Sequence, residues 1–165
     1  MNKKTEEILN QQVEKEGYSS HLYLAMASWA EVNGYAGMAK WLYVQSDEER
    51  IHMLKLIKYI NERNGQAILP ALKKPDKDYK SVKSMFEEVL KHEKFISDSI
   101  NEIVALCLKE KDYTTHNWIQ WFVKEQIEEE ASARKILDKI ALAGDNNLYL
   151  FDRDIMSLRK SDDKT

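Results

Sequence analysis

The stretch Ser46–Met53, SDEERIHM, places Glu49 and His52 in a segment whose apolar residues recur at helical spacing. The buried stripe of such a helix ordinarily carries leucine, yet here two potential metal ligands interrupt it. Taken alone, a Glu-x-x-His spacing is common on solvated helix faces. Its meaning depends on whether other helices are interrupted at the same level.

Glycine and proline divide the chain into four long segments and a short last one. The chain has only five glycines and two prolines, which favours long helices over short strands. The segments predict helices at about residues 5–33, 36–64, 81–110 and 113–143, and a fifth, short helix within LYLFDRDIMSLRK, residues 148–160. Ser81 or Ser84 can cap the third helix, and Asp112 or Thr114 the fourth.

The lengths of the connections predict the topology. The first and second helices, and the third and fourth, are joined by a few residues and must be antiparallel neighbours. Residues 65–80 could stretch about 50 Å, whereas a 28-residue helix is about 42 Å long. The expected fold is therefore an all-α four-helix bundle with one long crossover and a short C-terminal helix, forming a single domain over residues 1–165.

Composition limits the class of partner. Acidic and basic residues number 28 and 25, so the formal charge of −3 predicts neither a nucleic-acid nor a membrane partner. The single Cys107 cannot form an internal disulfide and is expected to be a small buried residue. No signal-peptide pattern or apolar run of about 18 residues is present, and we expect a cytoplasmic protein.

Each of the four predicted stripes is apolar at both ends and polar near its middle. The central polar residues are Glu16 in the first helix, Gln45, Glu49 and His52 in the second, Glu93 in the third, and Gln126 and Glu129 in the fourth. Mid-helix positions meet at one level in a bundle, whichever way the helices run. Glu16, Glu49, His52, Glu93, Gln126 and Glu129 are therefore predicted to share one interior pocket.

A multivalent cation would explain this pocket, because several buried carboxylates without a counter-charge are costly. Carboxylates with one imidazole and no thiolate suit Fe or Mn, and four carboxylates are enough for two ions. The alternative is a buried polar network, in which Glu16 pairs with Lys15 or Lys94. No Lys or Arg occupies the stripes, which favours the metal.

Over essentially its whole length the chain resembles the bacterial non-haem ferritins. The similar segments are EGYSSHLYLAMASW, SDEERIHM, HEKFISDSINEI, NWIQWFVKEQIEEE and GDNNLYLFDRDI. The resemblance implies that Glu16, Glu49 and His52 hold one iron, while Glu49, Glu93 and Glu129 hold a second. Glu49 would bridge the two ions, with Gln126 nearby. Tyr23 matches a tyrosine beside the diiron centre, as electron donor or hydrogen-bond partner; an ordinary core tyrosine is the alternative.

The resemblance also implies a third iron site, at Glu48, Glu125, Glu128 and Glu129. Without it, the first three of these residues would be read as solvated charges on helix faces. The implied activity is oxidation of Fe²⁺ by O₂ or H₂O₂, with storage of a ferric mineral. The implied assembly is a cage of 24 subunits with octahedral symmetry, and the last helix helps to form its fourfold contacts.

Differences from bacterioferritins and from animal ferritins narrow the predictions about haem binding and the iron entry route. Bacterioferritins carry a haem-ligating Met after the second-helix glutamate and a second Glu-x-x-His, whereas this chain has Arg50 and the sequence QIEE at 126–129. We therefore predict no haem. The acids that line the iron entry channel of animal ferritins are replaced by His116 and Ile119, so the resemblance defines no entry route.

Three other classes remain as alternatives. A rubrerythrin-like peroxidase would add paired cysteines. A DNA-shielding miniferritin would place its iron site between subunits and often has a lysine-rich tail, where this chain ends SLRKSDDKT. A non-catalytic helical signalling bundle would bury leucine at the four central glutamates.

Overall fold

The computed structural model describes residues 1–159, and within them all regular structure is helical. The long helices are α1 (Lys3–Val32), α2 (Ala36–Glu62), α3 (Val82–Lys109) and α4 (Tyr113–Ala143). These bounds confirm the four predicted helices to within two residues at each end. Ser81 caps α3 in a reciprocal capping box with Ser84, and Asp112 caps α4, as the sequence predicted.

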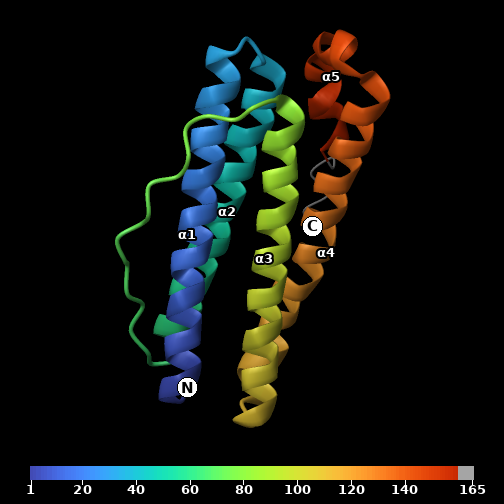
Figure 1. The fold of residues 1–165 in the computed structure, drawn as a ribbon. Coiled ribbons are helices and arrows are strands. Elements are labelled where there is room, and N and C mark those ends of the chain that lie inside the picture. Colours follow the sequence, from blue (N-terminus) through green and yellow to red (C-terminus); the bar gives the residue numbers. More distant parts are fainter. Residues whose placement is uncertain (160–165) are drawn as a thin grey trace.

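The helices form two antiparallel pairs joined by a long crossover. In Figure 1, α1 lies beside α2 and α3 beside α4, and the segment between α2 and α3 runs along α1 from one end of the bundle to the other. This segment, residues 63–81, has no helix or strand. The crossover topology predicted from loop length is confirmed. No helix among residues 1–159 has the length and apolar character required to cross a membrane.

The C-terminal segment is less helical than predicted. A 3₁₀ turn at Asp145–Asn147 leads into α5 (Leu148–Asp154), and a second 3₁₀ turn follows at Ile155–Leu158. The predicted fifth helix therefore changes to a tighter turn after Asp154. Its last residue, Lys160, and residues 161–165, which end the tail SLRKSDDKT, lie outside the described residues.

Asp152 attaches α5 to the start of α2. Its carboxylate accepts hydrogen bonds from the backbone N–H groups of Gly37 (3.1 Å) and Met38 (2.8 Å). These are first-turn amides of α2, and the residue before that helix supplies no side-chain cap of its own. A Cβ on Gly37 would lie 1.8 Å from the backbone oxygen of Asp152, so glycine is required for this close approach.

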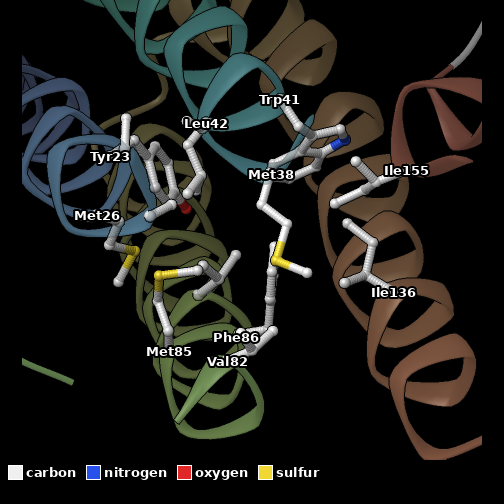
Figure 2. Packing of buried hydrophobic residues seen from close by; sticks show 14 of the residues in the cluster. Tyr23, Met26, Met38, Trp41, Leu42, Val82, Met85, Phe86, Ile136 and Ile155 are labelled. Atoms are coloured by element: carbon white, nitrogen blue, oxygen red, sulfur yellow. The ribbon is translucent and has the colours of Figure 1, made fainter. Parts of the chain in front are cut away.

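The apolar core is divided into two halves. One half lies toward α5 and includes Met26, Leu42 and Phe86, and it reaches Ile155 of the last turn, which lies beside Trp41 and Ile136 in Figure 2. The other half lies at the opposite end and includes residues such as Leu9, Leu56, Ile100 and Phe122. The polar stripe residues occupy the level between the two halves.

We predict that Asp152→Ala lowers the free energy of unfolding by about 1 kcal/mol, because two amides of α2 lose their cap. Guanidinium unfolding followed by far-UV circular dichroism measures this difference. Asp154→Ala is the matched control, since Asp154 is exposed and pairs only with the neighbouring Arg153. Equal stability of the two variants would show that the carboxylate of Asp152 does not hold α5 against α2.

Candidate metal centre

The predicted stripe residues lie in the bundle interior, with one exception. Glu16, Glu49, His52, Glu93 and Gln126 are buried, as are the apolar residues at both ends of their stripes. Glu129 is only partly buried. Polar side chains from all four helices therefore lie in the bundle interior.

Three of these side chains converge most closely. One potential ligand atom from each of Glu16, Glu49 and His52 lies within 4.8 Å of the others. The Nδ1 atom of His52 is 3.4 Å from Glu49 Oε2 and 4.0 Å from Glu16 Oε2. This is the only such group of three or more His, Cys, Asp or Glu residues within 1–159. Its arrangement suits one cation bound by two carboxylates and an imidazole.

One oxygen of this group has no partner. Glu16 Oε1 accepts a 2.8 Å hydrogen bond from Gln12 Nε2, but the fully buried Glu16 Oε2 has no hydrogen-bond donor. A buried carboxylate oxygen without a donor is costly. Either a proton shared with Glu49 or a metal ion beside His52 Nδ1 would satisfy it.

The remaining carboxylates are held by amide side chains. Gln126 Nε2 donates to Glu93 Oε2 at 3.1 Å, and Gln45 Nε2 donates to Glu129 Oε2 at 2.8 Å and to Glu49 Oε1 at 3.4 Å. The Tyr23 hydroxyl donates to Glu93 Oε1. These bonds orient the carboxylates but leave their charges uncompensated.

No lysine or arginine within residues 1–159 forms an ion pair with any of the four central glutamates. The proposed lysine network is therefore wrong, and Lys15 instead lies over the Phe95 ring, 5.5 Å from its centroid.

Aromatic side chains pack against His52. The rings of Trp121 and Phe122 meet the His52 imidazole edge-on, with centroids 5.4 Å and 5.9 Å away.

Burial without counter-charge raises the pKa of every carboxyl in the centre. Desolvation is the main cause for Glu16 and Glu49, and the charge of a neighbouring glutamate adds to it in both. Desolvation also raises the pKa of Glu93, and with the charge of Glu93 it raises that of Glu129 to about 8. Without metal the centre therefore holds protons that a cation would displace.

Comparison with known proteins agrees with this arrangement. A family model described as the ferritin-like domain matches residues 6–143. A bacterial non-haem ferritin of Campylobacter jejuni is 42% identical over 163 residues, which is 98% of each chain. A bacterial non-haem ferritin of Escherichia coli is 36% identical, over 92% of this chain and 93% of its own.

The chain belongs to the ferritin-like family. Its fold is also that of a solved open-pore ferritin from Archaeoglobus fulgidus, with a TM-score of 0.93 and 39% identity over 97% of this chain and 98% of that one. A leucine-lined signalling bundle, one of the alternatives considered, is inconsistent with the buried glutamates. The expected resemblance to bacterial non-haem ferritins is confirmed.

The residues that the resemblance assigns to a third ferritin iron site are less buried. Glu48, Glu125 and Glu128 are each partly exposed. Glu48 is near enough to Glu129 for its charge to contribute to the raised pKa of that carboxyl. These side chains are separate from the compact group formed by Glu16, Glu49 and His52.

Two participants were missed by sequence reasoning. Gln12 lies on the buried side of α1 and links Glu16 to the Ser99 hydroxyl, which donates to Gln12 Oε1. A buried glutamine four residues before a buried glutamate is a signal that could have found it. Arg159 forms an ion pair with Glu48, and it follows α5, where no helical period predicts its position.

We predict that Glu129→Gln changes how the stability of the metal-free ferritin depends on pH. Since the pKa of Glu129 is about 8 when folded and near 4.5 when unfolded, folding binds protons between these values. The free energy of unfolding therefore falls as pH rises through this window. The variant should lose the part of this decline that Glu129 contributes, becoming more stable relative to wild type at about pH 8.5 than at about pH 6.

Guanidinium unfolding at the two pH values measures the effect. Glu130→Gln is the neighbouring control. Hydrogen bonding to Ser97, with further stabilisation from Arg134, lowers the Glu130 pKa, so this carboxylate is ionised at both pH values. A Glu129→Gln variant with the same pH dependence as wild type would contradict the assigned pKa.

Proposed function

We propose that this ferritin stores iron and has ferroxidase activity, oxidising Fe²⁺ with O₂ or H₂O₂ and retaining the product as a ferric mineral. The observation that carries the proposal is the buried group Glu16–Glu49–His52 with an unsatisfied carboxylate oxygen. Such a group is stable as a cation site and unfavourable as an empty polar pocket.

The proposed ligand sets follow the helices. Glu16 of α1 with Glu49 and His52 of α2 would hold the first iron, and Glu49, Glu93 and Glu129 the second. Glu49 is the proposed bridge, because it belongs to the compact group and shares the donor Gln45 with Glu129. Gln126 would position Glu93 through its amide.

The donor set suits iron. Carboxylate oxygens and one imidazole bind Fe²⁺ well and favour Fe³⁺ more strongly, whereas structural zinc sites usually contain thiolates or more histidine. We propose two ions at this centre and a third at Glu48, Glu125, Glu128 and Glu129. We propose no haem, since Arg50 stands where bacterioferritins have the axial methionine.

Two adjacent Fe²⁺ ions can deliver two electrons to one oxidant. With O₂ the electrons and two protons give H₂O₂, and with H₂O₂ they give two waters after uptake of two protons. The protonated carboxyls of the metal-free centre would lose their protons as iron binds, so charge accumulates little. Trp121 and Phe122 pack against His52, which is buried.

Tyr23 would act mainly through Glu93. Its hydroxyl is buried and donates to the Oε1 atom of that carboxylate, and burial raises the pKa of the phenol. A neutral tyrosine in this position orients Glu93, and through this contact it would also be a neighbour of an iron held by Glu93 and a candidate electron donor. Of these two roles for Tyr23, we propose that it orients Glu93.

The proposed assembly is a closed cage of 24 copies with octahedral symmetry, in which residues 1–165 act as one domain in the cytoplasm. Large apolar side chains on the surface support assembly, among them Val32, Leu69, Leu142 and Tyr149, each more than 70% exposed. A monomer would leave these in water. Neither nucleic acid nor membrane is a proposed partner.

We predict that Glu49→Ala slows oxygen uptake by about 100-fold, because both irons lose a ligand; loss of an outer-shell partner alone costs 10- to 100-fold. Two Fe²⁺ per chain are added anaerobically to metal-free protein, and O₂ is then admitted. The control is Glu62→Ala, an exposed residue at the end of the same helix. Uptake by wild type no faster than in buffer would refute the ferroxidase.

We also predict a particle of about 470 kDa, 24 copies of the 19.4 kDa chain, by sedimentation or native mass spectrometry. Replacing Leu142 and Tyr149 together by glutamate should reduce the particle to smaller species, since both exposed apolar groups would become charged. A 19.4 kDa species in the wild type would refute the cage.

A further inference from the structure

Arg159 brings a positive charge from the C-terminal segment to α2. Its Nη2 pairs with Glu48 Oε2, and its Nη1 donates to Gln45 Oε1 and to the backbone oxygen of Trp41, both at 3.4 Å. The guanidinium also lies over the Trp41 indole, 5.2 Å from the ring centroid. Only 15% of the Arg159 side chain is exposed, so this is a packed position.

Two contacts anchor the segment that carries Arg159. Asp152 is hydrogen-bonded to the first turn of α2, and Ile155 is fully buried in the core against Trp41 and Ile136 (Figure 2). Arg159 follows four residues after Ile155. The guanidinium is therefore held on α2 by the docked chain before it, as well as by its own partners.

Gln45 connects this cation to the iron centre. Its oxygen accepts from Arg159, while its amide nitrogen donates to Glu129 Oε2 and Glu49 Oε1. One side chain thus separates the guanidinium from two carboxylates of the proposed second iron. The other arginine contact, Glu48, is a proposed ligand of the third site.

We propose that Arg159 competes with iron for the third site. In the iron-free protein its guanidinium neutralises Glu48 and orients Gln45, and a third cation binds only by displacing it from Glu48. The inference rests on the proposed function, because it assumes that Glu48 is an iron ligand. The guanidinium occupies Glu48 Oε2 and neutralises the charge of that carboxylate, so an ion that coordinates this oxygen must displace the arginine.

This competition sets an order of filling. The diiron carboxylates have amide donors but no cationic partner, whereas Glu48 already has one. The first two ions therefore bind with higher affinity, and the third binds when further Fe²⁺ is supplied. Removing the arginine should raise the affinity of the third site by about tenfold or more, since one charge-assisted hydrogen-bonded competitor is lost.

The test is anaerobic equilibrium dialysis of Fe²⁺ against the assembled, metal-free protein, with bound iron counted per chain. Wild type should show two tight sites and a weaker third. In Arg159→Gln the third site should tighten about tenfold or more. Arg153→Gln removes the same charge from the same segment, where it pairs with the exposed Asp154, and should match wild type.

A double-mutant cycle separates competition from a general effect on the cage. In a Glu48→Gln background the third site lacks its ligand, and Arg159→Gln should then leave iron binding unchanged. Arg159→Lys keeps the charge but not the fork that reaches both Glu48 and Gln45, and it should give an intermediate affinity. This variant also tests the proposal if Arg159→Gln does not assemble.

The outcomes are distinguishable. Two tight sites in wild type with an unchanged or weaker third site in Arg159→Gln would overturn the role of Arg159 and leave the ferritin function intact. Equal tightening in Arg153→Gln would also overturn it, because bulk charge would then be responsible. Fewer than two tight sites in wild type would refute the proposed diiron centre itself, and the inference with it.

Discussion

The burial of three glutamates inside a helical bundle, with a fourth partly buried beside them, is the constraint on which the rest of this structure depends. Glu16, Glu49, Glu93 and Glu129 separate an apolar half-core near α5 from another at the opposite end. Neither half continues through the middle, so the bundle forgoes hydrophobic stabilisation there and accepts several raised pKa values instead. A sequence optimised for stability alone would place leucine at these positions. The cost is consistent with a centre built to bind cations.

The side chains around these glutamates lower the free-energy cost of burying the carboxylates without preventing them from binding a cation. Gln12, Gln45 and Gln126 each donate a hydrogen bond to a carboxylate of the centre. An amide satisfies a lone pair and fixes a rotamer, but it carries no charge. A lysine in the same place would neutralise the carboxylate permanently and would have to be expelled by every incoming ion. Neutral donors therefore keep the centre oriented and still electrostatically unsatisfied, which is the state that favours a multivalent cation.

The parts of the site that the sequence predicts are those fixed by local helical period and loop length, and the parts that it does not predict depend on long-range contacts. The interior position of Glu16, Glu49, His52, Glu93 and Gln126 follows from helical period, because each occupies a stripe that is apolar on both sides. The crossover follows from loop length against helix length. Arg159 follows from neither. Its place depends on Asp152 capping α2, on the absence of a Cβ at Gly37 and on the burial of Ile155, which are long-range contacts that no local pattern encodes. The end of α5 was also mispredicted, since the helix changes to a 3₁₀ turn after Asp154, where no glycine or proline marks an end.

Arg159 also shows where a permanent cation is compatible with a metal site. At the buried Glu16 and Glu49, a guanidinium would be enclosed with the carboxylates, and its displacement would leave a charge without water. Glu48 is partly exposed, so both it and a displaced arginine can be solvated, and exchange between the guanidinium and a metal ion is feasible. Exposure therefore divides the acidic side chains into two kinds. The interior carboxylates are kept free of protein cations and bind ions first, while the peripheral carboxylate is occupied by a cation that can be replaced. Gln45 is hydrogen-bonded to Arg159 through its oxygen and to Glu49 and Glu129 through its nitrogen. Movement of Arg159 therefore affects the orientation of the two carboxylates, and ion binding at the carboxylates affects Arg159.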